Sequence, residues 1–93
     1  MSEVTTTQAA YEVARRGLYH LLGIKPVAHE ISVIASEIHG VELLLIALGD
    51  EAAAAPLASL SDELASLGAH EMSEYHPHLR RMLNRLVDLP WGR

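Results

Sequence analysis

The longest regular pattern of apolar residues in the chain runs from residue 27 to residue 48. Its members alternate at steps of four and three, and they are Val27, Ile31, Ile34, Ile38, Val41, Leu45 and Leu48. Residues at this spacing share one face of an α-helix, as the a and d positions of a heptad do. The pattern predicts a helix of about 33 Å from about Val27 to Leu48. Pro26 suits its first turn, where no N–H partner is needed.

Shorter stripes predict three further helices. The first begins near Thr5, which can form a capping box with Gln8, and it carries a stripe of Tyr11, Ala14, Leu18 and Leu21. The third is expected to start at Pro56 and to carry Leu57, Leu60, Leu64 and Leu67. The last is expected from Pro77 to just before Pro90, with Leu79, Met82, Leu86 and Leu89 on one face.

Glycines mark the ends of the first three predicted helices. Gly23, Gly49 and Gly68 each follow a Leu that closes a stripe, which is typical of a left-handed C-terminal cap. The segment from His70 to Tyr75 is compatible with either a short helix or a loop. No alternating run typical of a strand is present. We therefore predict an all-α fold, a small bundle of about four helices with a long central second helix.

A chain of 93 residues has room for one domain. We expect a single helical domain over residues 1–93, with 1–4 and 90–93 as short tails. The chain is 49% hydrophobic, which is rich for this size and favours a homodimer or higher oligomer. It lacks Cys, so a cytoplasmic location is the simplest expectation. No apolar run approaches the roughly 20 residues of a membrane span, and we expect no membrane association.

Charge is segregated along the sequence. Residues 26–79 contain acidic side chains throughout but no Lys or Arg. Glu37 and Glu42 flank the stripe of the second helix, so direct pairing of two copies of that helix would oppose like charges. Arg15 in the first helix and Arg85 in the last helix offer the opposite charge. We therefore expect the second helix to pack centrally, against the first and last helices.

The end of the second helix is apolar on every side, over residues 43–48. Neighbours within one small bundle cannot cover a whole helix circumference, so we expect Leu43, Leu44 or Ile46 to meet a second protomer. The alternative is a monomer in which the third helix covers that face. Trp91 is expected to fold back over the bundle, and it is also a candidate anchor for a partner. The candidate partner-binding residues are Glu37, Glu42, Leu43, Leu44, Ile46 and Trp91.

Six histidines raise the question of a metal site. His70, Glu74 and His78 would share one face of a helix and offer ligands suited to zinc or iron. Pro77 opposes the continuous helix that this spacing requires, and surface or capping histidines explain the pattern more simply. Metal binding by segment 70–78 is therefore an alternative, as is haem ligation by a histidine, and no other cofactor is expected.

The sequence carries no Gly-rich phosphate loop, no nucleophile elbow and no Cys, so an enzyme is not the main prediction. A small dimeric all-α enzyme, with Arg15, Arg16 and Lys25 on an anionic substrate, is the remaining catalytic alternative. A net charge of −5 opposes nucleic-acid binding. We predict a non-enzymatic protein-interaction or regulatory module, an adaptor, inhibitor or neutraliser. It would present an acidic and apolar helical surface to a protein with a basic surface.

Overall fold

The computed structural model describes residues 5–92; the predicted tail residues 1–4 and 93 lie outside this range. Its helices are α1 (Thr6–Leu22), α2 (Ala28–Ala47), α3 (Glu51–Gly68) and α4 (His76–Val87), followed by a short 3₁₀ helix, η1 (Pro90–Gly92). Residues 5–92 contain no strand. The predicted all-α bundle of four helices is confirmed, and the predicted C-terminal tail is helical over residues 90–92.

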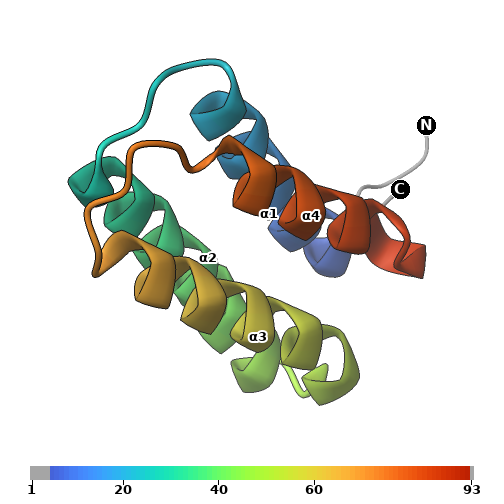
Figure 1. The fold of residues 1–93 in the computed structure, drawn as a ribbon. Helices are drawn as coiled ribbons and strands as arrows, with labels where there is room; N and C mark the ends of the chain where they lie inside the picture. The colour runs from blue at the N-terminus through green and yellow to red at the C-terminus, as the bar shows by residue number, and fades with distance from the viewer. Residues whose placement is uncertain (1–4, 93) are drawn as a thin grey trace.

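The helices lie in two layers (Figure 1). One layer holds α1 beside α4, and the other is an antiparallel hairpin of α2 and α3. The most extensive contact joins α2 to α3, and α1 packs on α2 across the layers. α4 packs mainly on α1 rather than on α2, so the expected contact between the second and last helices is wrong. The connection between α2 and α3 is only residues 48–50, and so short a link makes consecutive helices antiparallel neighbours.

The predicted stripes form one hydrophobic core. The four stripe residues of α1 are all buried, and so are Ile31, Ile34, Ile38 and Leu45 of α2. The two ends of the α2 stripe differ from the prediction, because Val27 and Leu48 are 55% and 60% exposed. Both lie just outside the helix, where no neighbouring helix covers them.

The start of α3 corrects a second expectation. Asp50 is the N-cap, and its side chain accepts a hydrogen bond from the backbone N–H of Ala53. Pro56 therefore lies inside α3 and not at its first position. A proline removes one helical hydrogen bond, here to the carbonyl of Ala52, which is exposed and accessible to water. Pro26 likewise lies outside α2, because Val27 is the N-cap.

Helix ends agree only in part with the predicted caps. The capping box of Thr5 and Gln8 is present. Among the three glycines, only Gly49 has a left-handed backbone, with φ of 83°. Gly23 has φ of −82°, and Gly68 is still part of α3. Gly68 is needed for another reason, because a Cβ there would lie 3.0 Å from the backbone nitrogen of Ser32 in α2.

Residues 69–75 form a loop that leads from α3 to α4. The hydroxyl of Tyr75 donates to the carbonyl of His70 at 2.6 Å and accepts from the N–H of Met72 at 3.1 Å. His76 follows, and its Nε2 lies 2.6 Å from the carbonyl oxygen of Ile24. These bonds hold the loop and tie the start of α4 to the connection between α1 and α2. α4 carries Pro77 in its first turn, as predicted.

Candidate functional site

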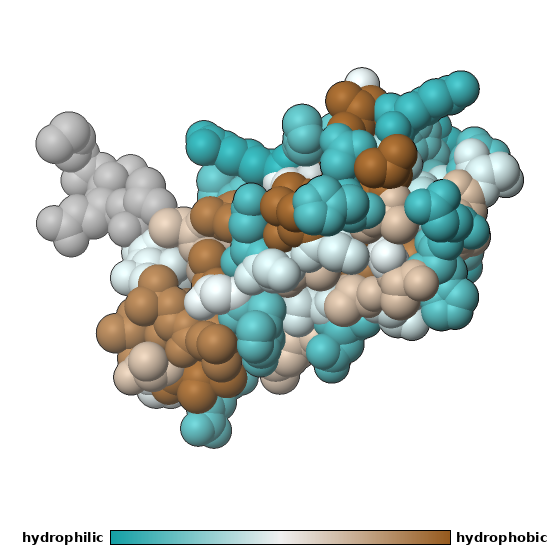
Figure 2. All heavy atoms as spheres, turned by 90° about the vertical axis from the view of Figure 1, so that its left-hand side faces the viewer, coloured by the Kyte–Doolittle hydropathy of each residue, from teal (hydrophilic) through white to brown (hydrophobic). Residues whose placement is uncertain are grey.

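Four large aliphatic side chains are exposed within the last turns of α2 and the residue after it. Leu43, Leu44, Ile46 and Leu48 are 51%, 47%, 43% and 60% exposed; we refer to them together as the α2 apolar surface. Figure 2 shows hydrophobic atoms gathered at the lower left of this view, toward the end of the molecule where α2 meets α3. The cause is local: only Leu45 of this run faces the core, and α1 and α3 cover one side of the helix.

The charges around this surface are acidic. The α2–α3 hairpin, residues 28–68, contains no Lys or Arg. Glu37 is exposed two turns before Leu44 on the same helix face, and Glu51 is exposed just after the turn that follows Leu48. The α2 apolar surface therefore has a carboxylate at each end along the hairpin.

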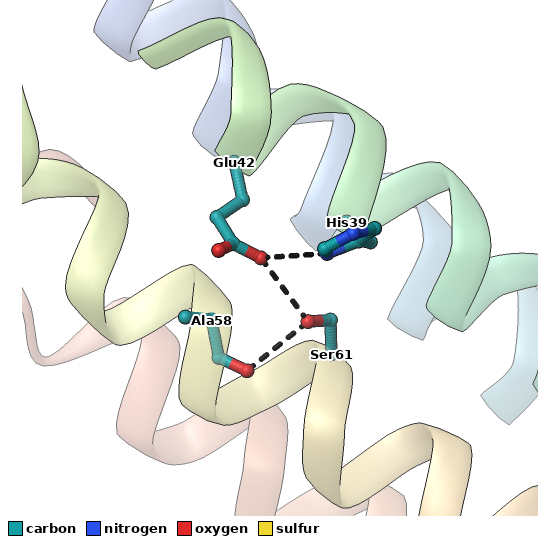
Figure 3. A network of polar contacts seen from close by, with 4 residues as sticks. All are labelled: His39, Glu42, Ala58 and Ser61. Atoms are coloured by element: carbon teal, nitrogen blue, oxygen red, sulfur yellow. Dashed lines mark hydrogen bonds and ion pairs between the residues drawn. The ribbon is translucent and has the colours of Figure 1, made fainter. Parts of the chain in front are cut away.

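Glu42, a further candidate residue, points into the hairpin (Figure 3). It is 8% exposed, and its Oε1 lies 2.9 Å from Nδ1 of His39. The Ser61 hydroxyl of α3 lies 3.5 Å from the same oxygen and 3.0 Å from the carbonyl of Ala58. A hydroxyl has one proton to donate, and the shorter contact favours Ala58. Glu42 thus connects α2 to α3 and contributes little to the surface that a partner could reach.

The order of groups in this network does not suit nucleophilic catalysis. The carboxylate of Glu42 stands between His39 and Ser61, so the contacts of the hydroxyl do not include the imidazole that would take up its proton. Ser61 is also only 3% exposed, which leaves a substrate no approach to its oxygen. The network joins two helices and satisfies a buried carboxylate.

Trp91 packs against the bundle. Its ring centroid lies 5.8 Å from that of Tyr11, with the two planes inclined at 41°. Tyr11 is buried and donates a hydrogen bond of 2.6 Å from its hydroxyl to the carbonyl of Ala53. Burial, together with the nearby Asp50 carboxylate, raises the pKa of Tyr11 to about 12. Trp91 is half-buried in this contact, and the short helix η1 that carries it packs on α1 and α4.

The three candidate metal ligands do not converge. His70 and His78 line the same cavity between α3 and α4, but Glu74 is not among the residues around it. The spacing considered for these ligands requires a helix, whereas His70 and Glu74 lie in the loop before α4. Within residues 5–92, no group of three or more His, Asp or Glu side chains is placed to hold a metal ion.

Two features of the surface were not predicted from the sequence. Leu48 was assigned to the buried stripe, but the helix ends at Ala47 and leaves it outside. The cavity between α3 and α4 is lined by residues of two helices and a loop. These residues come together only in the folded chain, so no local sequence pattern predicts the cavity.

No helix within residues 5–92 combines the length and the apolarity needed to cross a bilayer. The sequence matches no known protein-family model, and neither a curated protein nor a solved structure was found to match the chain.

Proposed function

We propose that this protein is a non-enzymatic protein-interaction module that binds a partner through the α2 apolar surface. The partner has an apolar centre with basic residues around it. The observation that carries the proposal is the exposure of four large aliphatic side chains within six consecutive positions, 43 to 48.

The free energy available from burying the α2 apolar surface supports a role for this surface at the centre of a larger interface. Full burial of a Leu or Ile side chain contributes about 1.5 to 3 kcal/mol, so covering four half-exposed ones contributes roughly 3 to 6 kcal/mol. Association costs at least about 4 kcal/mol in lost translational and rotational freedom. The α2 apolar surface therefore needs contacts around its rim, as the energetically dominant core of most interfaces does.

The charges around the surface favour a basic partner. Glu37 and Glu51 are exposed at its two ends, and the hairpin carries no cation to neutralise them internally. Lys or Arg residues on the partner would speed the encounter and fix its orientation. A second copy of the chain is the alternative occupant, because an apolar surface can pair with itself about a two-fold axis.

The test compares substitutions of similar chemistry on the same helix. We expect Leu44→Asp and Ile46→Asp to weaken partner binding at least about tenfold, because a buried and unpaired carboxylate costs several kcal/mol. Val33→Asp is the matched control, since Val33 is 42% exposed on α2 but lies outside the α2 apolar surface. Affinity capture from host extract with a photo-crosslinker at position 44 or 33 would identify the partner and the contact.

Far-UV circular dichroism must show equal helix content for all variants. Crosslinking from position 44 and not from 33, with loss of the partner in both Asp variants, supports the proposal. A partner that all three Asp variants retain equally would contradict it. Light scattering, which measures molecular mass, tests whether a second copy of the chain occupies the surface instead. A dimer that becomes a monomer in the Leu44→Asp variant would assign the surface to self-association.

A further inference from the structure

A half-open cavity of about 950 Å³ lies between α3 and α4, at the end where the loop 69–75 joins them. Its volume falls within the range of roughly 300 to 1,000 Å³ that small-molecule sites occupy. None of its lining residues belongs to α2, so it is separate from the α2 apolar surface. It can therefore be considered independently of the proposed function.

The wall formed by the loop has a fixed course. The Tyr75 hydroxyl holds the carbonyl of His70 and the N–H of Met72, and the Tyr75 side chain is itself buried. His70 and Met72 both line the cavity. Met72, Leu67 of α3 and Met82 of α4 give the cavity an apolar side, and thioether side chains adapt readily to the shape of a ligand.

The polar side of the cavity offers a cation and hydrogen-bond donors. Arg85 is paired with Glu63 of α3, so its charge is compensated. Arg81 lies one turn earlier, and its NH2 group is 2.7 Å from Nδ1 of His78. Because an arginine only donates, Nδ1 of His78 must accept, and the neutral imidazole then carries its proton on Nε2.

Arg81 is therefore the cavity's available cation. Within residues 5–92 no carboxylate forms an ion pair with it. Ser66 and Asn84 also line the cavity and can donate hydrogen bonds. Glu71 is the competing charge, an exposed carboxylate on the loop wall. Arg81 is exposed as well, and its contact with Nδ1 of His78 orients the guanidinium toward a ligand.

We propose that this cavity binds a small amphipathic anion. Its carboxylate or phosphate group contacts Arg81 and His78, and its short apolar part lies against Leu67, Met72 and Met82. Arginine provides several N–H donors in one plane, the geometry that an oxyanion accepts. The adjacent methionines and leucine exclude water from the apolar part of the ligand.

The first test uses octanoate as the probe, titrated into the full chain and followed by amide chemical shifts. We expect saturable shifts concentrated in residues 66–72 and 78–85. Octanol and octylamine have the same chain length but a neutral or cationic head, and should bind about tenfold more weakly because they lack the charged hydrogen bonds to Arg81. Acetate should also bind at least about tenfold more weakly, because it lacks the apolar chain.

The second test uses two adjacent arginines of α4. Arg81→Gln should weaken octanoate binding about tenfold, whereas Arg80→Gln, with the same charge change outside the cavity lining, should change it less than about twofold. Glu71→Gln should strengthen binding, because it removes the competing carboxylate. Absence of saturation, equal loss in both arginine variants, or octylamine binding as tightly as octanoate would overturn the proposal.

Discussion

At the scale of single residues, Tyr11 of α1 contacts both α3 and the C-terminal turn. Its ring packs on Trp91, and its hydroxyl donates to Ala53 at the start of α3. Ala53 belongs to the turn just before Pro56, where the proline already interrupts the helical hydrogen bonds of α3. One buried side chain thus fastens α1, α3 and the C-terminal turn together.

The same burial makes stability depend on pH above 10. An unfolded tyrosine ionises near pH 10, whereas the pKa of Tyr11 in the folded chain is about 12. Between these values the folded state keeps a proton that the unfolded state has lost, so the stabilisation is complete below pH 10 and declines as the pH rises to 12. We expect a loss of about 2 to 3 kcal/mol of unfolding free energy, measured by urea denaturation.

Tyr11→Phe is the control for this pH effect. It should be about 1 to 2 kcal/mol less stable at pH 7, because the Ala53 carbonyl loses its buried donor. Tyr11→Phe should also lack the additional decrease in unfolding free energy that we expect for the natural chain between pH 10 and 12. Parallel declines of the unfolding free energy in both proteins would assign the effect to groups other than Tyr11.

At the scale of helices, regular apolar spacing predicted the number of elements and most of their bounds. It failed at Pro56, where a common rule places proline in the first turn of a helix. The alanines at 52–55 and the Asp50 cap instead extend α3 to 18 residues. Because the third helix was predicted to be short, its packing along the whole of α2 was not predicted, and the first and last helices were named as the main neighbours of α2 instead.

The candidate surface was predictable to a similar degree. Leu43, Leu44 and Ile46 stand out because the helix is apolar all round, and this requires only local sequence. Glu42 was placed on the acidic flank, but Ser61 of α3 lies against it and the hairpin buries it. Its burial depends on which helix becomes the neighbour, and that information is tertiary.

α3 approaches α2 closely at Gly68, and two glycine substitutions should test this contact. A Cβ at Gly68 would lie 3.0 Å from the nitrogen of Ser32 and 3.1 Å from the carbonyl of Ala28, and backbone atoms cannot move aside cheaply. We expect Gly68→Ala to destabilise by about 1 to 3 kcal/mol in urea denaturation.

Gly40 is the matched control on α2, because a Cβ there would have no atom within 4 Å. Gly40→Ala should stabilise by about 0.5 to 1 kcal/mol through helix propensity alone. Stabilisation by both substitutions would mean that α3 does not approach α2 as closely as described.

At the scale of the whole molecule, connectivity decided which helices pair, and charge did not. Arg85 was expected to face the acidic flank of α2, but it pairs with Glu63 of α3. Arg15 pairs with Glu12 of its own helix. An exposed ion pair contributes only about 0.2 to 1 kcal/mol to stability. A short connection makes two consecutive helices antiparallel neighbours, and their long apolar faces then pack together.

The pair between Arg85 and Glu63 joins the α1–α4 layer to the α2–α3 layer, so it offers a direct comparison of charge with packing. A double-mutant cycle of Arg85→Gln and Glu63→Gln should give a coupling below about 1 kcal/mol that shrinks further in high salt. Leu64→Ala, at the next position of α3 and fully buried, should cost about 2 to 5 kcal/mol with little salt dependence. A coupling as large as the Leu64→Ala effect in urea denaturation would mean that electrostatics, and not the shared core, holds the two layers together.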